Sequence, residues 1–334
     1  MATMDDIAKK LGTTKGTVSK ALSGAEDISE TMRKAVLEAA VELGYNRVNR
    51  ASHKPKICVF IENISYANPD DFGWGIITGF RKMAEPAGYA VDIVDLTNTL
   101  QKSIHYDTYM LQHNYKGGFF LGTTLSDPWL TDFATCRTPT VLYDNHPQYN
   151  PNVSTVSIDN DEGMEIAIST LHKQGHKTIG YLSGALGAYV FQQRYMAFFH
   201  ALRKHGMNDD RKLAGHPYHT AECLESDLPR LLGLGCTAII CSHDLLAHAV
   251  MIHCKEIGVR IPEDLSIIGI DDLPICRYTD PPLSSIRQDR NELGKSAFYA
   301  LSSQIEQVHL NTLKLHPELV LRGSVGSAPR LKNF

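Results

Sequence analysis

Short apolar runs alternate with longer amphipathic segments through most of this chain, and this alternation limits the folds that it can adopt. Residues 57–61 form a nearly continuous apolar run, as expected for a strand in a sheet that is covered on both faces. Residues 72–86 then have the pattern of a helix, and residues 89–94 that of a second strand. Strands that alternate with helices in this way predict βαβ units and parallel sheets.

The alternation continues and then starts again after Asp159. Further strands are expected at residues 117–122, 140–143, 178–182, 237–241 and 265–270. Further helices are expected at residues 162–173, 192–205 and 244–257. Two such series in tandem predict an α/β region made of two doubly wound parallel-sheet lobes.

A different pattern occupies the first 45 residues, where helical spacing replaces alternation. Met4, Ile7, Ala8 and Leu11 lie at i, i+3, i+4 and i+7, one face of a short helix. Thr3 followed by Asp6 resembles a capping box at its start, and Gly12 ends the helix because glycine tolerates a left-handed conformation.

Two more helices follow. Thr14 caps a second helix with Val18, Ala21 and Leu22 on its apolar face, and Ser29 caps a third that ends at Gly44. The core stripe of the third is expected to be Met32, Val36, Ala40 and Leu43. This small all-α unit predicts a helix-turn-helix domain that places its second helix in the major groove of DNA. The alternative is a pair of amphipathic helices that pack one end of a domain.

The residues that decide between these readings are 4–22, Ser29-Glu30-Thr31, Arg33 and Leu43-Gly44-Tyr45. Together they resemble the DNA-binding headpiece of the lactose/galactose repressor family. The resemblance implies that Lys15, Gly16 and Lys20 face base edges, where lysine can donate to guanine O6 and N7. It implies that Thr14, Thr17 and Ser19 contact phosphate or cap the helix.

Residues 46–56 form a short linker with four Lys or Arg. It is either a solvated tether or a phosphate-binding segment in which Arg47 and Arg50 take part. The family's hinge helix, which ends in a leucine wedge for the minor groove, is expected to be missing here. The DNA-binding residues predicted are thus Thr14, Lys15, Gly16, Thr17, Ser19, Lys20, Arg47 and Arg50.

Polar residues follow several of the predicted strands. Asp144, His243-Asp244 and Asp271-Asp272 stand at strand ends, and Arg194 lies near the start of a helix that follows a strand. Each alone is most simply a helix cap or a solvated charge. Because ligands bind beyond the carboxyl ends of parallel strands, the group as a whole predicts a binding site.

The resemblance to the same family extends to about residue 324 through segments 175–182, 194–202, 259–272 and 281–289. It implies a periplasmic-binding-protein-like effector domain that holds a small molecule, often a sugar, between two lobes. Arg194 and Asp271 take the positions that hydrogen-bond the effector, and Asp144 and Gln288 line the cleft.

Two further candidates depart from the family pattern. His243 stands where the family usually has asparagine, and we expect it either to make binding pH-sensitive near neutrality or to be a buried, satisfied histidine. Trp74 lies in a lengthened loop and either stacks on a sugar ring or belongs to the core. The effector-binding residues predicted are Trp74, Asp144, Arg194, His243, Asp271 and Gln288.

The domain boundaries follow from these patterns. The headpiece is expected at residues 1–46, the linker at 47–56, the effector and dimerisation domain at 57–326 and a tail at 327–334. We expect the first lobe to span about 57–158 plus 287–316, and the second about 159–284 plus 317–326.

Charge and composition are compatible with a DNA-binding regulator but do not by themselves indicate one. The 334 residues carry a formal net charge of −4, of which residues 1–54, with nine Lys or Arg against seven Asp or Glu, contribute +2. No signal peptide or membrane span is apparent, and seven cysteines without a C-x-x-C pair suit reduced thiols in a cytoplasm. Neither a metal site nor a cofactor is expected, and no catalytic motif stands out.

The sequence therefore predicts a cytoplasmic, effector-responsive transcription regulator, expected to be a repressor. A homodimer is expected because one short recognition helix, roughly 12 Å long, contacts only a few base pairs. Its partners would be a double-stranded DNA operator and a small-molecule effector, with no membrane. Two alternatives stay open: a solute-binding protein of sugar transport, and an enzyme with an accessory DNA-binding domain.

Overall fold

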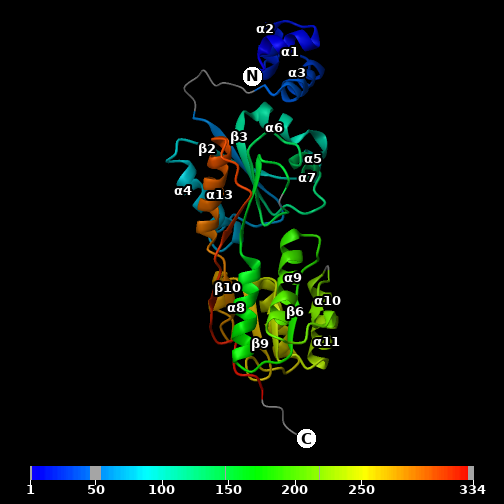
Figure 1. The fold of residues 1–334 in the computed structure, drawn as a ribbon, viewed down its shortest axis with the longest axis vertical. Helices are drawn as coiled ribbons and strands as arrows, with labels where there is room; N and C mark the ends of the chain where they lie inside the picture. Colours follow the sequence, from blue (N-terminus) through cyan, green and yellow to red (C-terminus); the bar gives the residue numbers. More distant parts are fainter. Residues whose placement is uncertain (1, 46–53, 147, 218, 330–334) are drawn as a thin grey trace. The chain divides into compact units, whose positions relative to one another are not determined.

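A computed structural model describes residues 2–45, 54–146, 148–217 and 219–329 of the chain. Its first part is a headpiece of three helices, drawn in blue in Figure 1. These are α1 (Met4–Leu11), α2 (Lys15–Ser23) and α3 (Glu30–Leu43). Each is preceded by a hydroxyl side chain and followed by a left-handed glycine, so the predicted caps Thr3, Thr14, Ser29, Gly12 and Gly44 are confirmed.

The headpiece has a core of its own. Ile7 of α1, Val18 of α2 and Val36 of α3 are fully buried against one another. Around them pack the remaining predicted apolar positions, including the partly buried Met32 and Leu43. Burial of these side chains, about 1.5–3 kcal/mol each for the larger ones, is what stabilises helices that are too short to persist alone.

The first lobe is built on a six-stranded sheet in the order β11-β5-β4-β3-β1-β2. Its strands are β1 (Lys56–Ile61), β2 (Ala90–Asp95), β3 (Tyr115–Leu121), β4 (Thr140–Tyr143), β5 (Val153–Ile158) and β11 (Thr312–Leu315). Its helices are α4 (Phe72–Ala84), α5 (Asn98–Ser103), α6 (Tyr106–His113), α7 (Trp129–Phe133) and α13 (Arg290–Ile305). Strands β1 to β5 pair in parallel along this order, as predicted.

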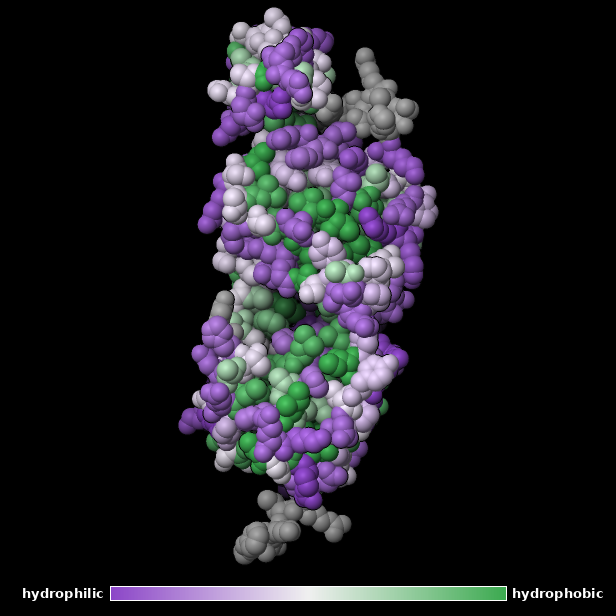
Figure 2. All heavy atoms as spheres, turned by 180° about the vertical axis from the view of Figure 1, so that it is seen from behind, coloured by the Kyte–Doolittle hydropathy of each residue, from purple (hydrophilic) through white to green (hydrophobic). Residues whose placement is uncertain are grey.

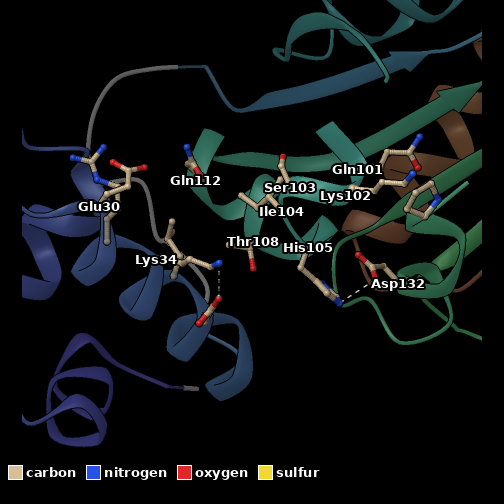
Figure 3. Close-up of a pocket in the computed structure, with 14 residues that line it drawn as sticks. Glu30, Lys34, Gln101, Lys102, Ser103, Ile104, His105, Thr108, Gln112 and Asp132 are labelled. Carbon is tan, nitrogen blue, oxygen red and sulfur yellow. Dashed lines mark ion pairs between the residues drawn. The ribbon is translucent and has the colours of Figure 1, made fainter. Parts of the chain in front are cut away.

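Aromatic rings fill one side of this sheet. Phe60 stacks on Phe120 with ring centroids 4.5 Å apart, and Tyr106 and Trp129 meet Phe60 edge-on. Helix α6 is fixed at its first residue by Asp132, whose carboxylate accepts from the Tyr106 N–H and pairs with His105 at 3.1 Å. Figure 3 shows the His105 ring directed toward Asp132.

The second lobe contains another six-stranded sheet, in the order β12-β10-β9-β8-β6-β7. Its strands are β6 (Ile179–Leu182), β7 (Ala214–Gly215), β8 (Ala238–Cys241), β9 (Ser266–Asp271), β10 (Ser284–Arg287) and β12 (Glu318–Val320). Its helices are α8 (Asn160–Lys173), α9 (Tyr189–Lys204), α10 (Thr220–Glu222), α11 (Leu228–Gly233) and α12 (Asp244–Glu256). The inner strands pair in parallel, and β12 joins β10 antiparallel.

These two parallel sheets confirm the predicted fold class, including every strand and helix expected from residue 57 to residue 270 within a few residues at each end. The described chain divides into two compact units, one of Met1–Ile64, Phe80–Val156 and Lys295–Leu313, and one of Ser65–Gly79, Ser157–Gly294 and Lys314–Phe334. Gln288, expected with the first lobe, falls in the second unit. The predictions for the hinge helix, Arg47 and Arg50 concern residues outside those that the structure describes.

The surface is chemically mixed. Figure 2 shows green hydrophobic side chains reaching the surface over each lobe, whereas the headpiece is largely purple and white on the face in view. Among the described residues, no helix is both long and apolar enough to cross a membrane.

Candidate functional site

Helix α2 presents a polar face to solvent. Its buried side holds Val18, Ala21 and Leu22, so the residues between them must point outward. Lys15, Gly16, Ser19 and Lys20 are all exposed. The helix therefore offers a short polar ridge that carries two lysines and has the size that a DNA groove accepts.

Thr14 and Thr17 organise the start of this helix. Thr14 Oγ1 accepts from the Thr17 N–H at 3.2 Å and lies 3.0 Å from the Thr17 hydroxyl. Thr14 thus has the capping role that the sequence left open beside phosphate contact. Gly16 has only the Thr14 hydroxyl near the place where a Cβ would lie, at 3.7 Å, so the ridge has a gap at this position.

Both lysines of the ridge are paired within the headpiece. Lys15 Nζ donates to Asp5 Oδ2 of α1 at 2.7 Å. Lys20 Nζ donates to Asp27 Oδ2 in the segment that follows α2. The hydrogen bond from Lys20 lowers the pKa of Asp27 below its usual value. Sequence reasoning did not foresee these acidic partners.

A second cluster of polar side chains lies in the second lobe, where the parallel strands β6, β8, β9 and β10 end. Its centre is Arg194 on α9, which is 3% exposed. The guanidinium donates from Nε to Asn160 Oδ1 at 3.0 Å and from Nη1 to the Ser242 carbonyl at 2.5 Å. Its Nη2 lies 3.9 Å from Asp271 Oδ1. The buried positive charge is therefore balanced by one carboxylate and two neutral acceptors.

Asp271 and Gln288 form the other half of the cluster. The Gln288 amide donates to Asp271 Oδ1 at 2.6 Å, and both residues are buried. Asp271 has a backbone φ of 118°, a conformation that residues other than glycine rarely adopt. Residues held in such conformations cluster at functional sites, because the surrounding structure must compensate for the strain.

His243 lies beside Arg194 and caps α12. The Leu246 N–H donates to His243 Nδ1 at 3.0 Å, so the ring replaces the oxygen that usually caps a helix. Burial, together with the charge of Arg194, lowers the pKa of His243 to about 4. The ring is thus neutral at physiological pH with its proton on Nε2. The side chain is partly buried and held as a helix cap, and a pKa this low argues against a titration near neutrality. A role of His243 in effector binding stays a prediction.

Asp244 and Asp272, which also stand at strand ends, hold the lobe together. Asp244 accepts from the Leu273 N–H at 2.7 Å and from the Ser285 hydroxyl at 2.6 Å. Asp272 accepts from Arg287 at 2.8 Å and from Arg322 at 2.6 Å. Their carboxylates are therefore occupied by the loops and strands next to them.

The remaining two predicted effector residues belong to other elements of the chain. Asp144 follows β4 of the first lobe, with its N–H donating to the Val156 carbonyl at 3.0 Å and φ 47. Trp74 lies in the first turn of α4 and is 41% exposed, so it is not a core residue. Their contribution to ligand binding stays a prediction.

Two polar groups that sequence reasoning missed complete the Arg194 site: the Asn160 amide and the Ser242 carbonyl. Asn160 directly follows β5 and Asp159, so recognition of that strand would have placed it at a strand end like the others. Among the described residues, no group of three or more His, Cys, Asp or Glu could hold a metal ion. All seven cysteines are buried and free.

A helix-turn-helix headpiece followed by two parallel-sheet lobes, one with a buried polar cluster at its strand ends, defines a ligand-responsive DNA-binding regulator. Family models agree with this class: residues 3–47 match "Bacterial regulatory proteins, lacI family", and residues 168–325 match a periplasmic binding protein-like domain. The transcriptional repressor CytR of Escherichia coli strain K12 is 30% identical over 98% of this chain and 97% of its own length. The chain therefore belongs to the lacI family of transcription regulators.

Another relative fits this assignment, and two solved structures share the fold. The transcriptional repressor PurR of Aliivibrio salmonicida is 26% identical over 97% of this chain and 99% of its own length. A transcriptional regulator CelR–cellobiose complex has the same fold, with a TM-score of 0.68 at 23% identity over 97% of this chain and all of that one. A lac repressor dimer bound to operator and an anti-inducer has a TM-score of 0.65 at 21% identity, over 97% of this chain and 99% of that one.

Proposed function

We propose that this regulator is a cytoplasmic repressor that binds its operator as a homodimer through the α2 ridge and responds to an uncharged, polyhydroxylated effector, a sugar or sugar derivative. The effector binds at the Arg194–Asp271–Gln288 cluster of the second lobe. Asp144 and Trp74 are proposed as further effector contacts, and Arg47 and Arg50 as further DNA contacts. The chain has no catalytic role in this proposal.

One observation carries the choice of effector: the polar cluster is balanced in charge. Arg194 is paired with Asp271, and His243, with a pKa of about 4, adds no charge at neutral pH. An anionic effector would leave the site with an excess negative charge in a desolvated position, which is costly. Neutral hydroxyl groups can donate to Asp271 and accept from Arg194 without this cost.

The identity of the ligand class is tested by thermal denaturation of the full chain with neutral mono- and disaccharides and with the corresponding sugar phosphates. A ligand that binds only the folded state raises the melting temperature, and the rise grows with the logarithm of the ligand concentration divided by its dissociation constant. We expect a rise with one or more neutral sugars and none with their phosphates. A rise with phosphates alone would contradict the charge argument.

The site is tested with Arg194→Gln, and Arg203→Gln serves as its matched control. Both residues are on α9, but Arg203 is half-exposed and pairs with Asp209 at 3.2 Å. We expect Arg194→Gln to abolish the sugar-dependent rise and the sugar-dependent change in DNA affinity together, while Arg203→Gln keeps both. If Arg194→Gln lost sugar binding but kept the sugar-dependent change in DNA affinity, the proposed coupling would be wrong.

The role of the lysines is tested on DNA. An operator is first selected from a random duplex library with the full chain, and binding is then compared with a scrambled duplex of equal composition. Lys15→Ala and Lys20→Ala are each expected to reduce the preference for the operator, because they remove donors to base edges. An equal loss of affinity for both duplexes would instead identify the lysines as phosphate contacts.

A further inference from the structure

The two carboxylates that pair with the α2 lysines come from different parts of the headpiece. Asp5 lies in the first turn of α1, and Asp27 lies in the segment between α2 and α3. All four side chains are more than half exposed: 62% and 63% for Lys15 and Asp5, 57% and 59% for Lys20 and Asp27. Both pairs therefore lie at the solvent surface that α2 presents.

Such pairs are not needed to hold the headpiece together. Solvent-exposed ion pairs stabilise proteins weakly, and α1 and α2 are already joined through the fully buried Ile7 and Val18. What the pairs do decide is the state of the lysines before they meet DNA. The carboxylate competes with a base or a phosphate for each ammonium group, which must turn at least one of its three donors toward the DNA.

The replacement of the carboxylate by an acceptor on DNA differs between the operator and other DNA sequences. Guanine O6 and N7 offer a lysine two acceptors that replace its carboxylate. Where the base offers no such acceptors, the lysine can interact favourably with the DNA only through a phosphate. The carboxylate that it leaves is then repelled by the negatively charged DNA backbone. The carboxylate therefore opposes wrong sequences more than the right one.

We infer that Asp5 and Asp27 set the sequence specificity of this headpiece by holding Lys15 and Lys20 away from phosphate on non-operator DNA. This inference rests on the proposed base-reading role of the two lysines. By charge alone, these two acidic residues oppose DNA binding. In this inference they increase the preference for the operator over other sequences.

The test compares Asp27→Asn with Glu26→Gln in the full chain. Glu26 is the exposed neighbour of Asp27 and lies outside the two pairs, so its replacement removes the same charge from the same segment. Affinities for the selected operator and for the scrambled duplex are measured over a range of salt concentrations. Asp5→Asn is the parallel variant, with a thermal melt to check α1, because Asp5 also stands near its N-terminus.

Asp27→Asn is expected to tighten binding to the scrambled duplex severalfold more than Glu26→Gln does, and to tighten operator binding less. On the scrambled duplex, the slope of log affinity against log salt should steepen by about one, as for one additional phosphate contact. In the Lys20→Ala background the Asp27→Asn gain should shrink to that of the control.

Two results would overturn the inference, and they are distinguishable. If Asp27→Asn and Glu26→Gln change the operator preference and the salt slope equally while Lys20→Ala still reduces that preference, only the role of Asp27 fails. If Lys20→Ala leaves the operator preference unchanged, the base-reading role of Lys20 fails and the inference fails with it.

Discussion

Gln288 donates its side-chain N–H to Asp271 Oδ1 at 2.6 Å, and this bond connects the residue that follows β10 to the last residue of β9. Gln288 is 2% and Asp271 9% exposed, and Asp271 has φ 118. The amide thus fixes the direction of a carboxylate whose backbone is already strained. A carboxylate held in one direction recognises a hydroxyl group without losing further rotational freedom on binding.

Gln288→Ala should therefore weaken effector binding. A hydrogen bond to a charged group contributes about 1.5–3 kcal/mol, so the dissociation constant should rise by one to two orders of magnitude. Titration calorimetry with the sugar found by thermal denaturation measures this. An unchanged dissociation constant would remove Gln288 and the orientation of Asp271 from the site.

His243 should make the protein less stable in mild acid. Its pKa is about 4 in the folded protein, against a usual value of 6.5. The unfolded chain therefore binds the proton more readily, and the stability is full above pH 6.5, falls as the pH drops toward 4 and then levels off. The loss amounts to at most about 3 kcal/mol, at 1.36 kcal/mol per pKa unit.

His243→Asn checks this, since asparagine also caps helices well but does not titrate. Urea denaturation of both proteins between pH 4 and pH 7 should show a smaller loss of stability for the variant. Parallel curves would mean that His243 has the same pKa in the folded and unfolded chain. Between pH 7 and pH 8, effector affinity should show no titration from this residue.

Gly269→Ala should destabilise the second lobe. A Cβ on Gly269 would overlap the Asp244 Oδ1 atom, and that carboxylate is held by the Leu273 N–H and the Ser285 hydroxyl. Overpacking of this kind costs about 1–3 kcal/mol. Burial raises the pKa of Asp244 to about 6, so the contact is with a group that cannot easily move into water.

The same contact predicts a coupling. Asp244→Ala alone should cost about 1–3 kcal/mol for each of its two partners that loses its acceptor. The double variant with Gly269→Ala should be more stable than the sum of the two losses predicts, because the overlap is gone. Strict additivity in urea denaturation would show that Gly269 and Asp244 do not constrain one another.

Thr14→Ala should loosen the start of α2. Thr14 caps the helix through the Thr17 N–H at 3.2 Å, and loss of such a cap costs about 1 kcal/mol. Thr14→Ser keeps the hydroxyl and serves as the control. We expect a lower melting temperature of the headpiece transition for the alanine variant alone, together with weaker DNA binding. If both variants melted alike, the cap would not stabilise α2.

Much of the fold could be predicted from the sequence because most strands are apolar runs and most helices carry caps. Two of the strands that were not predicted are of another kind. Ser284–Arg287 and Val153–Ile158 contain buried serines and a threonine whose hydroxyls have partners far away in the chain: Ser285 donates to Asp244, and Ser154 to the Leu310 carbonyl. From sequence alone, a polar residue is predicted to be exposed, because the distant group that it hydrogen-bonds when buried is not known.

The candidate site was partly predictable for the same reason. Asp271 and Gln288 stand at strand ends, Arg194 lies near the start of a helix that follows a strand, and all three match a family pattern, so they could be placed together. The structural roles of Asp244 and Asp272 could not be separated from binding, since they depend on partners 29 and 41 residues away for Asp244 and 15 and 50 for Asp272. The ion pairs of Asp5 and Asp27 with the lysines could not be predicted, because they depend on which helices and loops lie close together in space.

The seven buried cysteines have a practical consequence. Burial raises the pKa of every one of these thiols, so that little thiolate is present at neutral pH. A cysteine introduced at an exposed position such as Glu26 would react with a maleimide dye far faster than any native one. The natural chain is thus ready for single-site fluorescent labelling, and none of its own cysteines has to be replaced first.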